Sequence, residues 1–178
     1  MDRRGLPDGL VTRMNTTEPE WVFAYGSNMD LDDLRGWLAD QGQSANGIQR
    51  VEQAALPDHR LVWNYHSVSR QGGAANVEPC AGRDLPGLAL LVDAATLQAI
   101  DRKEGNPRYY SRGRSPLTLR LQGGQEVSAW VYVAVPERCS DTPVPPRRAY
   151  LGLLLKAARK YALPAWYLAE LEGTMTAD

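Results

Sequence analysis

The chain has 178 residues, of which 43% are hydrophobic and 23% are charged, as is usual for one globular domain. Its 20 Lys and Arg residues nearly balance 21 Asp and Glu residues. The net charge of −1 gives no electrostatic reason to expect a nucleic acid or an anionic membrane as partner. No apolar run approaches the ~20 residues that cross a membrane. We expect residues 1–19 to be a flexible tail and residues 20–178 to be a single domain.

Cysteine and histidine are too scarce for a disulfide framework or a typical His-rich metal site. The chain has two cysteines, Cys80 and Cys139, and two histidines, His59 and His66. It carries no CxxC, HExxH or GxxxxGK[ST] motif. We therefore expect a protein of the reducing cytoplasm that uses no metal and no cofactor. The sequence leaves open whether it is a monomer or a homodimer.

Hydrophobic patterning in the first half of the chain predicts mostly strands. A buried strand at residues 22–25 runs straight into a helix at 30–39, for which Asn28 or Asp30 is the candidate cap. Strand composition and turn-forming residues then predict short strands at residues 48–55, 59–67, 74–79 and 88–92, with turns at 69–73 and 81–87.

Helices and one hairpin are predicted in the second half. Asp93 caps a helix that Gly105 ends, and segments 109–121 and 126–135 form a hairpin around two consecutive glycines. Two helices follow, at residues 148–163 and 164–173, and the first has one face formed by Tyr150, Leu153, Leu154 and Ala157. This mixture, with few βαβ alternations, predicts an α+β fold with a mixed, barrel-like sheet and flanking helices.

The stretch WVFAYGSNMD, residues 21–30, places three small polar residues between the first strand and the first helix. Where a strand feeds a helix directly, the N–H groups and positive dipole of the helix N-terminus suit a carboxylate, a phosphate or a developing oxyanion. The alternative is structural, with Gly26 turning the chain while Ser27 and Asn28 cap the helix. Both interpretations can hold together. A phosphate loop and a nucleophile elbow are disfavoured, because GxGxxG and GxSxG are absent.

A second candidate feature is AIDRKEGNPRYY, residues 99–110, in which Glu104 is the last residue before Gly105. At a helix C-terminus the dipole disfavours a carboxylate by up to ~1 kcal/mol, and desolvation acts in the same direction. A glutamate placed there can have a raised pKa and serve as a base that later returns its proton. The alternative is an exposed glutamate at a charged helix end, and we expect neighbouring Asp101 and Lys103 to be solvated.

Both stretches, in this order, resemble the γ-glutamylcyclotransferase family. FAYGSNM is similar to the strand-and-loop signature of the family, and LQAIDRKEG is similar to its helix that ends in an acidic residue and a glycine. Two further segments, GGAANVEPCAGRDLPGLALLV and PPRRAYLGLLLKAARKYALPAWYLAELEG, resemble family segments in the same order. The resemblance covers about residues 21–173, and Met29 stands where leucine is commoner.

The resemblance implies a cofactor-independent enzyme that acts on a small γ-glutamyl substrate. The substrate's own α-amine would attack its γ-carbonyl and release 5-oxoproline, with Glu104 as general base and acid. The implied substrate-binding residues are Val22, Phe23, Ala24, Tyr25, Gly26, Ser27, Asn28, Tyr110 and Tyr150. Tyr109 is the alternative to Tyr110, Tyr150 can equally be a core residue, and Arg112 can equally be an exposed strand residue.

Two other functions are compatible with the same residues, since a fold alone does not settle function. One is a non-catalytic barrel that binds a small ligand at the glycine corner. The other is a biosynthetic step that removes a γ-glutamyl protecting group from an amine. An acid at position 104 favours an enzyme over a binding module, whereas the identity of the leaving group cannot be read from the sequence.

Overall fold

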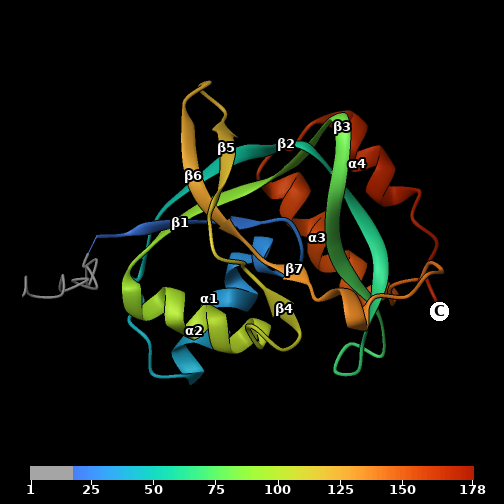
Figure 1. Cartoon of the computed structure of the whole chain (residues 1–178), viewed down its shortest axis with the longest axis horizontal. Coiled ribbons are helices and arrows are strands. Elements are labelled where there is room, and N and C mark those ends of the chain that lie inside the picture. The colour runs from blue at the N-terminus through green and yellow to red at the C-terminus, as the bar shows by residue number, and fades with distance from the viewer. Residues whose placement is uncertain (1–17) are drawn as a thin grey trace, which may run out of the picture.

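The computed structural model describes residues 18–178, so the expected N-terminal tail falls almost entirely outside the described residues. The elements follow one another from blue to red in Figure 1. The strands are β1 (Glu20–Ala24), β2 (Ile48–Ser67), β3 (Gly72–Val92), β4 (Tyr110–Ser111), β5 (Leu117–Leu121), β6 (Glu126–Val131) and β7 (Val133–Ala134). The helices are α1 (Leu31–Asp40), α2 (Ala94–Glu104), α3 (Arg148–Lys160) and α4 (Ala165–Glu172), with 3-10 turns η1 (Ser27–Met29) and η2 (Pro136–Arg138).

Five strands close into a barrel in the order β1-β3-β2-β5-β6, and β6 pairs back with β1. The β1–β6 pair is parallel, whereas the other neighbours pair antiparallel. Closure satisfies the backbone groups that the edge of an open sheet leaves unpaired. β4 and β7 form a separate two-stranded sheet. The predicted α+β class, with a barrel-like sheet and flanking helices, is confirmed.

β2 and β3 are longer than predicted, because segments expected to be turns continue the ladder. The two strands expected between residues 48 and 67 are one strand, and the expected turn 81–87 lies within β3. The register shifts just after Pro57. There Asp58 has a φ of 56°, and its carboxylate accepts the N–H of Gly82 at 2.8 Å. A β-bulge uses the same residue types as a turn, which explains the wrong prediction.

The predicted hairpin of 109–121 with 126–135 is correct only in its central part. β5 and β6 pair across the turn that contains Gly123 and Gly124, and Gly124 has the φ of 89° that favours glycine. The outer ends separate from this hairpin and become β4 and β7, which pair with each other. Pro116 lies just before β5 and has no N–H to continue the ladder.

The helices begin and end close to the predicted residues. Asp30, rather than Asn28, caps α1, because its Oδ1 accepts two first-turn N–H groups at 3.1 and 3.2 Å. η1 intervenes between β1 and α1, so the strand does not feed the helix directly. α2 is capped by Asp93 and ends at Gly105, which adopts the left-handed conformation with a φ of 64°.

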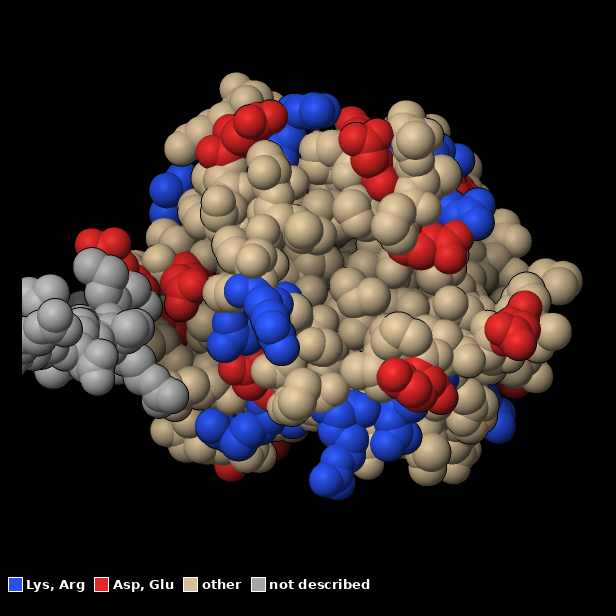
Figure 2. Space-filling model, in the orientation of Figure 1, with Lys and Arg blue, Asp and Glu red and all other residues tan. Residues whose placement is uncertain are grey.

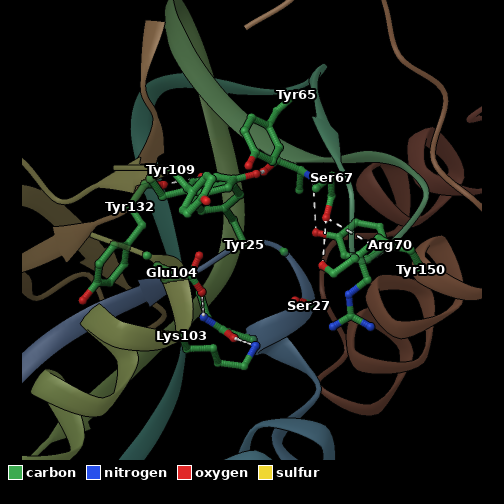
Figure 3. A pocket seen from close by; sticks show the side chains of 18 of the residues that line it. Tyr25, Ser27, Tyr65, Ser67, Arg70, Lys103, Glu104, Tyr109, Tyr132 and Tyr150 are labelled. Carbon is green, nitrogen blue, oxygen red and sulfur yellow. Dashed lines mark hydrogen bonds between the residues drawn. The ribbon is translucent and has the colours of Figure 1, made fainter. Parts of the chain in front are cut away.

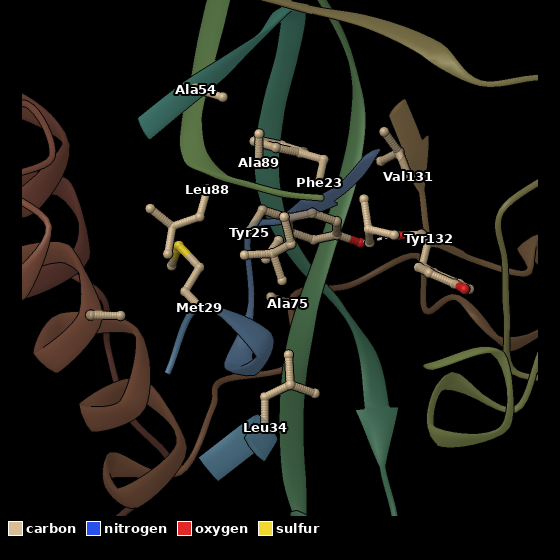
Figure 4. Close-up of a cluster of buried hydrophobic side chains, with 14 of the residues drawn as sticks. Phe23, Tyr25, Met29, Leu34, Ala54, Ala75, Leu88, Ala89, Val131 and Tyr132 are labelled. Atoms are coloured by element: carbon tan, nitrogen blue, oxygen red, sulfur yellow. Dashed lines mark hydrogen bonds between the residues drawn. The ribbon is translucent and has the colours of Figure 1, made fainter. Parts of the chain in front are cut away.

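The hydrophobic core fills the barrel and continues toward α3 (Figure 4). Phe23 and Leu88 lie inside it, and Met29 of η1 is buried between the barrel and α3. The buried residues of α3 are Tyr150, Leu151, Leu154, Ala157 and Ala158. Leu153 of the predicted face is only partly buried but packs against this core. Because α3 packs against η1, it forms one wall beside the corner after β1.

Charged side chains of both signs are interspersed over the face of the molecule seen in Figure 2. At the surface of the molecule several arginines pair with carboxylates, such as Arg83 with Glu170 and Arg159 with Glu172, both at 2.8 Å or less. Within residues 18–178, no helix is both long enough and apolar enough to cross a membrane.

Candidate active site

A cavity of about 1110 Å³ opens where the β1–η1 corner, the β2–β3 turn, the end of α2 and the start of α3 meet. Figure 3 shows side chains from these segments around one space. The predicted site residues that line it are Phe23, Ala24, Tyr25, Gly26, Ser27, Asn28, Glu104, Tyr110 and Tyr150. Val22 does not line the cavity: it is buried in β1, which pairs there with β3 on one side and β6 on the other.

The corner after β1 offers peptide N–H groups to the cavity. η1 is closed by two hydrogen bonds, from Met29 N to Gly26 O and from Asp30 N to Ser27 O, each 3.0 Å long. The N–H groups of Gly26, Ser27 and Asn28 donate to no acceptor within residues 18–178. These residues line the cavity, and buried N–H groups without a protein acceptor need another partner such as water or a ligand.

The first turn of α1 does not add the N–H groups of Asp32 and Asp33 to those of the corner, contrary to the expectation from the sequence. The Asp30 side chain caps it and also pairs with Lys156 of α3, Oδ2 to Nζ, at 2.9 Å. Burial opposes ionisation of Asp30, but hydrogen bonds from Lys156 and from the N–H groups of Asp33 and Asp32 outweigh burial and lower its pKa. Any positive potential at the corner therefore comes from its own peptide N–H groups rather than from the dipole of α1.

Glu104 ends α2 and lines the cavity across from the corner (Figure 3). The side-chain N–H of Asn28 donates to its Oε1 at 2.8 Å. Burial raises the pKa of Glu104, and the charge of Lys103, the Asn28 hydrogen bond and the charge of Arg70 offset part of that rise. The raised pKa agrees with the expectation, with desolvation as its main cause.

Lys103 and Asp101 are not solvated as expected, because both make specific contacts. Lys103 donates from Nζ to Asn28 Oδ1 at 2.9 Å, and burial lowers the pKa of its ammonium. Asp101 accepts from Arg112 Nε at 2.8 Å and from the Tyr132 hydroxyl at 2.7 Å. These contacts hold the end of α2 in place. Helical spacing could not reveal them, since Asn28, Arg112 and Tyr132 come from other segments.

Tyrosine hydroxyls connect the cavity wall to the barrel. Ala75 of β3 donates its N–H to the Tyr150 hydroxyl at 3.2 Å, and its carbonyl accepts from the Tyr110 hydroxyl at 2.8 Å. Tyr25 donates its hydroxyl to the carbonyl of Tyr132. Burial raises the pKa of Tyr25, Tyr110 and Tyr150. The phenols are therefore neutral at physiological pH and form an uncharged wall.

Tyr109 and Tyr110 both line the cavity, but they lie at different depths. Tyr109 is 41% exposed and lies under the Arg138 guanidinium, 4.3 Å from the ring centroid. Tyr110 is partly buried and packs edge-on against Tyr65, with ring centroids 4.9 Å apart. Arg112 is neither exposed nor in the cavity, since it stacks on the Trp130 ring at 4.3 Å.

Sequence reasoning missed the cavity residues of β2 and the turn after it, among them Tyr65, Ser67 and Arg70 (Figure 3). Arg70 reaches over the Tyr150 ring, 5.5 Å from its centroid, and approaches Asp33 of α1 at 3.8 Å. The sequence indicates only a turn at 69–73. A cation in a turn is a weak signal, because most such residues face solvent.

The sequence matches a family model described as gamma-glutamyl cyclotransferase, AIG2-like, over residues 22–151. That range includes every site residue predicted from the sequence. A protein of Methanocaldococcus jannaschii, named as a candidate gamma-glutamylcyclotransferase, is 44% identical over 48 residues. The match covers 27% of this chain and 38% of that protein, so the chain matches well under half of this relative's length.

Solved structures share the fold over most of the chain. A structure described as gamma-glutamyl cyclotransferase has a TM-score of 0.73 at 20% identity, over 90% of both chains. An uncharacterized human protein has a TM-score of 0.72 at 22% identity, also over 90% of both chains. YkqA of Bacillus subtilis has a TM-score of 0.71 at 16% identity, over 89% of this chain and 56% of its own. Because the identities are low, these structural matches show a shared fold alone. The match to the family model over residues 22–151 shows that the chain belongs to the gamma-glutamyl cyclotransferase, AIG2-like family.

Proposed function

We propose that the protein releases 5-oxoproline from γ-glutamyl amino acids or γ-glutamylamines, with Glu104 as general base and acid. The observation that carries this proposal is one cavity lined both by Glu104 and by the corner residues Gly26 and Ser27. A base and a set of oxyanion donors that face one space are what an intramolecular acyl transfer requires.

The proposed reaction needs no enzyme nucleophile, but the attacking nitrogen has to lose two protons. An α-ammonium group has a pKa near ~8, so most of the substrate is protonated at neutral pH. Glu104 takes the first proton, and the amine nitrogen then forms a bond to the γ-carbon, giving a tetrahedral oxyanion with a positively charged ring nitrogen. Glu104 passes the first proton to the leaving nitrogen, whose bond to the γ-carbon breaks as the oxyanion collapses to the ring carbonyl. Glu104 then takes the second proton from the ring nitrogen, which leaves a neutral lactam, and the released amine carries that proton away as an ammonium ion. The raised pKa of Glu104 suits both the uptake and the return of a proton, since it lies nearer to the pKa of the substrate amine.

The corner supplies the electrostatic part of the proposal. A preorganised N–H donor at a developing oxyanion contributes about 3 kcal/mol to catalysis, and the N–H groups of Gly26, Ser27 and Asn28 have no acceptor in residues 18–178. The same groups are equally suited to the α-carboxylate of the substrate. Gly26 keeps the corner open, because a methyl group there would come within 3.2 Å of the Tyr150 hydroxyl and of Ala75 Cβ.

The cavity also has to hold the flexible glutamyl chain in a folded form, so that the amine meets the carbonyl. Such orientation accounts for several kcal/mol of a reaction barrier. The neutral tyrosines Tyr25, Tyr110 and Tyr150 give this wall a fixed shape, since each hydroxyl is hydrogen-bonded to the backbone of another segment. The volume of about 1110 Å³ leaves room for a leaving group beside the glutamyl part.

The test is a panel of γ-glutamyl amino acids, γ-glutamylamines and glutathione, each incubated with the protein and analysed for 5-oxoproline by mass spectrometry. Glu104→Gln should lower kcat by about 10²–10⁴-fold, while substrate affinity measured by calorimetry changes little. Glu137→Gln, an exposed acid at the rim of the same cavity, is the matched control. Binding without 5-oxoproline from any substrate would favour a non-catalytic binding barrel. Full turnover by Glu104→Gln would remove Glu104 from the mechanism.

A further inference from the structure

The Asn28 side chain lies between two charged residues at the end of α2. Its Oδ1 accepts a hydrogen bond from Lys103 Nζ at 2.9 Å, and its Nδ2 donates to Glu104 Oε1 at 2.8 Å. Figure 3 labels Lys103 and Glu104 and marks the hydrogen bonds beside their side chains with dashed lines. The three side chains thus form a series of hydrogen bonds, Lys103 to Asn28 to Glu104, that links the end of α2 to η1.

An amide has a donor end and an acceptor end, and its neighbours decide which way it faces. The ammonium of Lys103 can only donate, so it selects the oxygen of Asn28. The amide N–H groups of Asn28 then face Glu104, whose ionised carboxylate can only accept. If the amide were reversed, its oxygen would face the carboxylate without a proton between them. Lys103 therefore decides whether Asn28 stabilises the charged form of Glu104.

We propose that Lys103 is a positioning residue of the site, which fixes the Asn28 amide so that it donates to Glu104 and keeps that carboxylate ionised and directed at the cavity. This inference rests on the proposed role of Glu104 as the base. Lys103 suits the task because it lies in the last turn of α2, where the helix dipole favours a cation and disfavours the carboxylate beside it.

The other groups near Glu104 do not replace Lys103. Arg70, from the β2–β3 turn, is the second cation that lowers the pKa of Glu104, and its contribution is smaller than that of Lys103. The charges of Glu104 and of Asp33 in α1 favour the ammonium form of Lys103. Burial raises the pKa of the tyrosines around Glu104, so they stay neutral in the working range: Tyr25, Tyr65, Tyr110, Tyr132 and Tyr150. The other charged or titratable side chains of the cavity are His66, Arg102, Tyr109, Glu137 and Arg138, and none of them is among the groups that shift the pKa of Glu104.

The test compares Lys103→Met with Lys103→Arg, whose guanidinium can still donate to Asn28. In Lys103→Met the pKa of Glu104 should rise by about 1 unit, since a nearby opposite charge and an oriented donor are both lost. The acid limb of the pH profile of kcat/KM should move to higher pH by the same amount. In Lys103→Arg the Glu104 pKa and the acid limb should both stay close to those of the wild type. Arg102→Met, which removes an exposed charge from the same helical turn, should leave the acid limb in place.

The pKa of Glu104 is measured by carbon-13 NMR titration of labelled glutamate carboxyls, with Glu104→Gln to assign the signal. This readout needs no turnover, so it decides the role of Lys103 even if no substrate gives 5-oxoproline. A Lys103→Met variant with an unmoved Glu104 titration, or with a raised KM and an unmoved acid limb, would overturn the proposal. If Lys103→Met does not fold, Asn28→Asp tests the same series of hydrogen bonds, because an ionised carboxylate at position 28 cannot donate to Glu104 and its charge should raise the Glu104 pKa further.

Discussion

Replacing Glu104 by glutamine should stabilise the protein at alkaline pH although it removes the proposed base. Burial raises the pKa of the Glu104 carboxyl despite the nearby Lys103 and Asn28. Folding at alkaline pH therefore transfers an ionised carboxylate from water into the cavity wall, and a neutral amide avoids that cost. The glutamine oxygen can still accept the 2.8 Å hydrogen bond from Asn28, so the variant retains that partner.

The sign and size of the effect follow from proton linkage. Because the folded pKa of Glu104 exceeds the unfolded one, wild-type stability falls as the pH rises through the interval between them. Each unit by which the pKa is raised corresponds to about 1.4 kcal/mol, and ~1 kcal/mol shifts the Tm of a chain this long by about 2–4 °C. Glu104→Gln should melt a few degrees above wild type near pH 8 and together with it below the ordinary Glu pKa of 4.5.

Thermal unfolding followed by circular dichroism at both pH values measures this difference. The control is Glu137→Gln, an exposed acid at the rim of the same cavity, for which the Tm difference from wild type should be the same at both pH values. A Glu104→Gln variant that melts below wild type near pH 8 would refute the reasoning. So would a gain of equal size at both pH values, because a pH-independent gain cannot come from the ionisation of Glu104.

Two further positions test how the corner is built. Asp30→Ala removes the α1 cap and should lower the free energy of unfolding in urea by about 1 kcal/mol, whereas Asp30→Asn keeps a capping oxygen. Since the pKa of Asp30 is lowered, the wild type should have a higher free energy of unfolding than Asp30→Asn at neutral pH, and this difference should disappear on acidification. A difference that grows in acid would contradict this reasoning. Gly26→Ala should reduce kcat/KM about tenfold with little change in Tm, because the methyl would lie 3.2 Å from the Tyr150 hydroxyl, and unaltered kinetics would show that close approach at Gly26 is not needed.

The parts of the site that lie on one continuous segment could be predicted from the sequence. The corner Gly26–Asn28 and the acid Glu104 are each marked by local signals, a glycine after a buried strand and an acid before a helix-ending glycine. The Asp93 cap of α2 and the β5–β6 turn were predictable for the same reason, since cap and turn preferences act over a few residues. Closure into a barrel followed from the number of short strands and the need to cover edges.

The parts that failed depend on pairing across the chain. A turn and a bulge use similar residues, so 81–87 could be placed within β3 only by knowing that β2 continues opposite it. Lys103 and Asp101 look like ordinary surface charges until Asn28, Arg112 and Tyr132 are placed beside them. Arg70 enters the cavity only because the β2–β3 turn folds over Tyr150.

The two halves of the site are joined by more than the contact between Asn28 and Glu104. Tyr25 of the corner donates to the carbonyl of Tyr132, and the Tyr132 hydroxyl donates to Asp101, one turn before Glu104. A second connection therefore runs from Tyr25, just after β1, through the residue that separates β6 from β7 to the end of α2. Because both connections end in the last turn of α2, a shift of this helix would break hydrogen bonds to two other segments. The position of Glu104 relative to the corner is thus held from two sides, as the proposed reaction of one short substrate between distant segments would require.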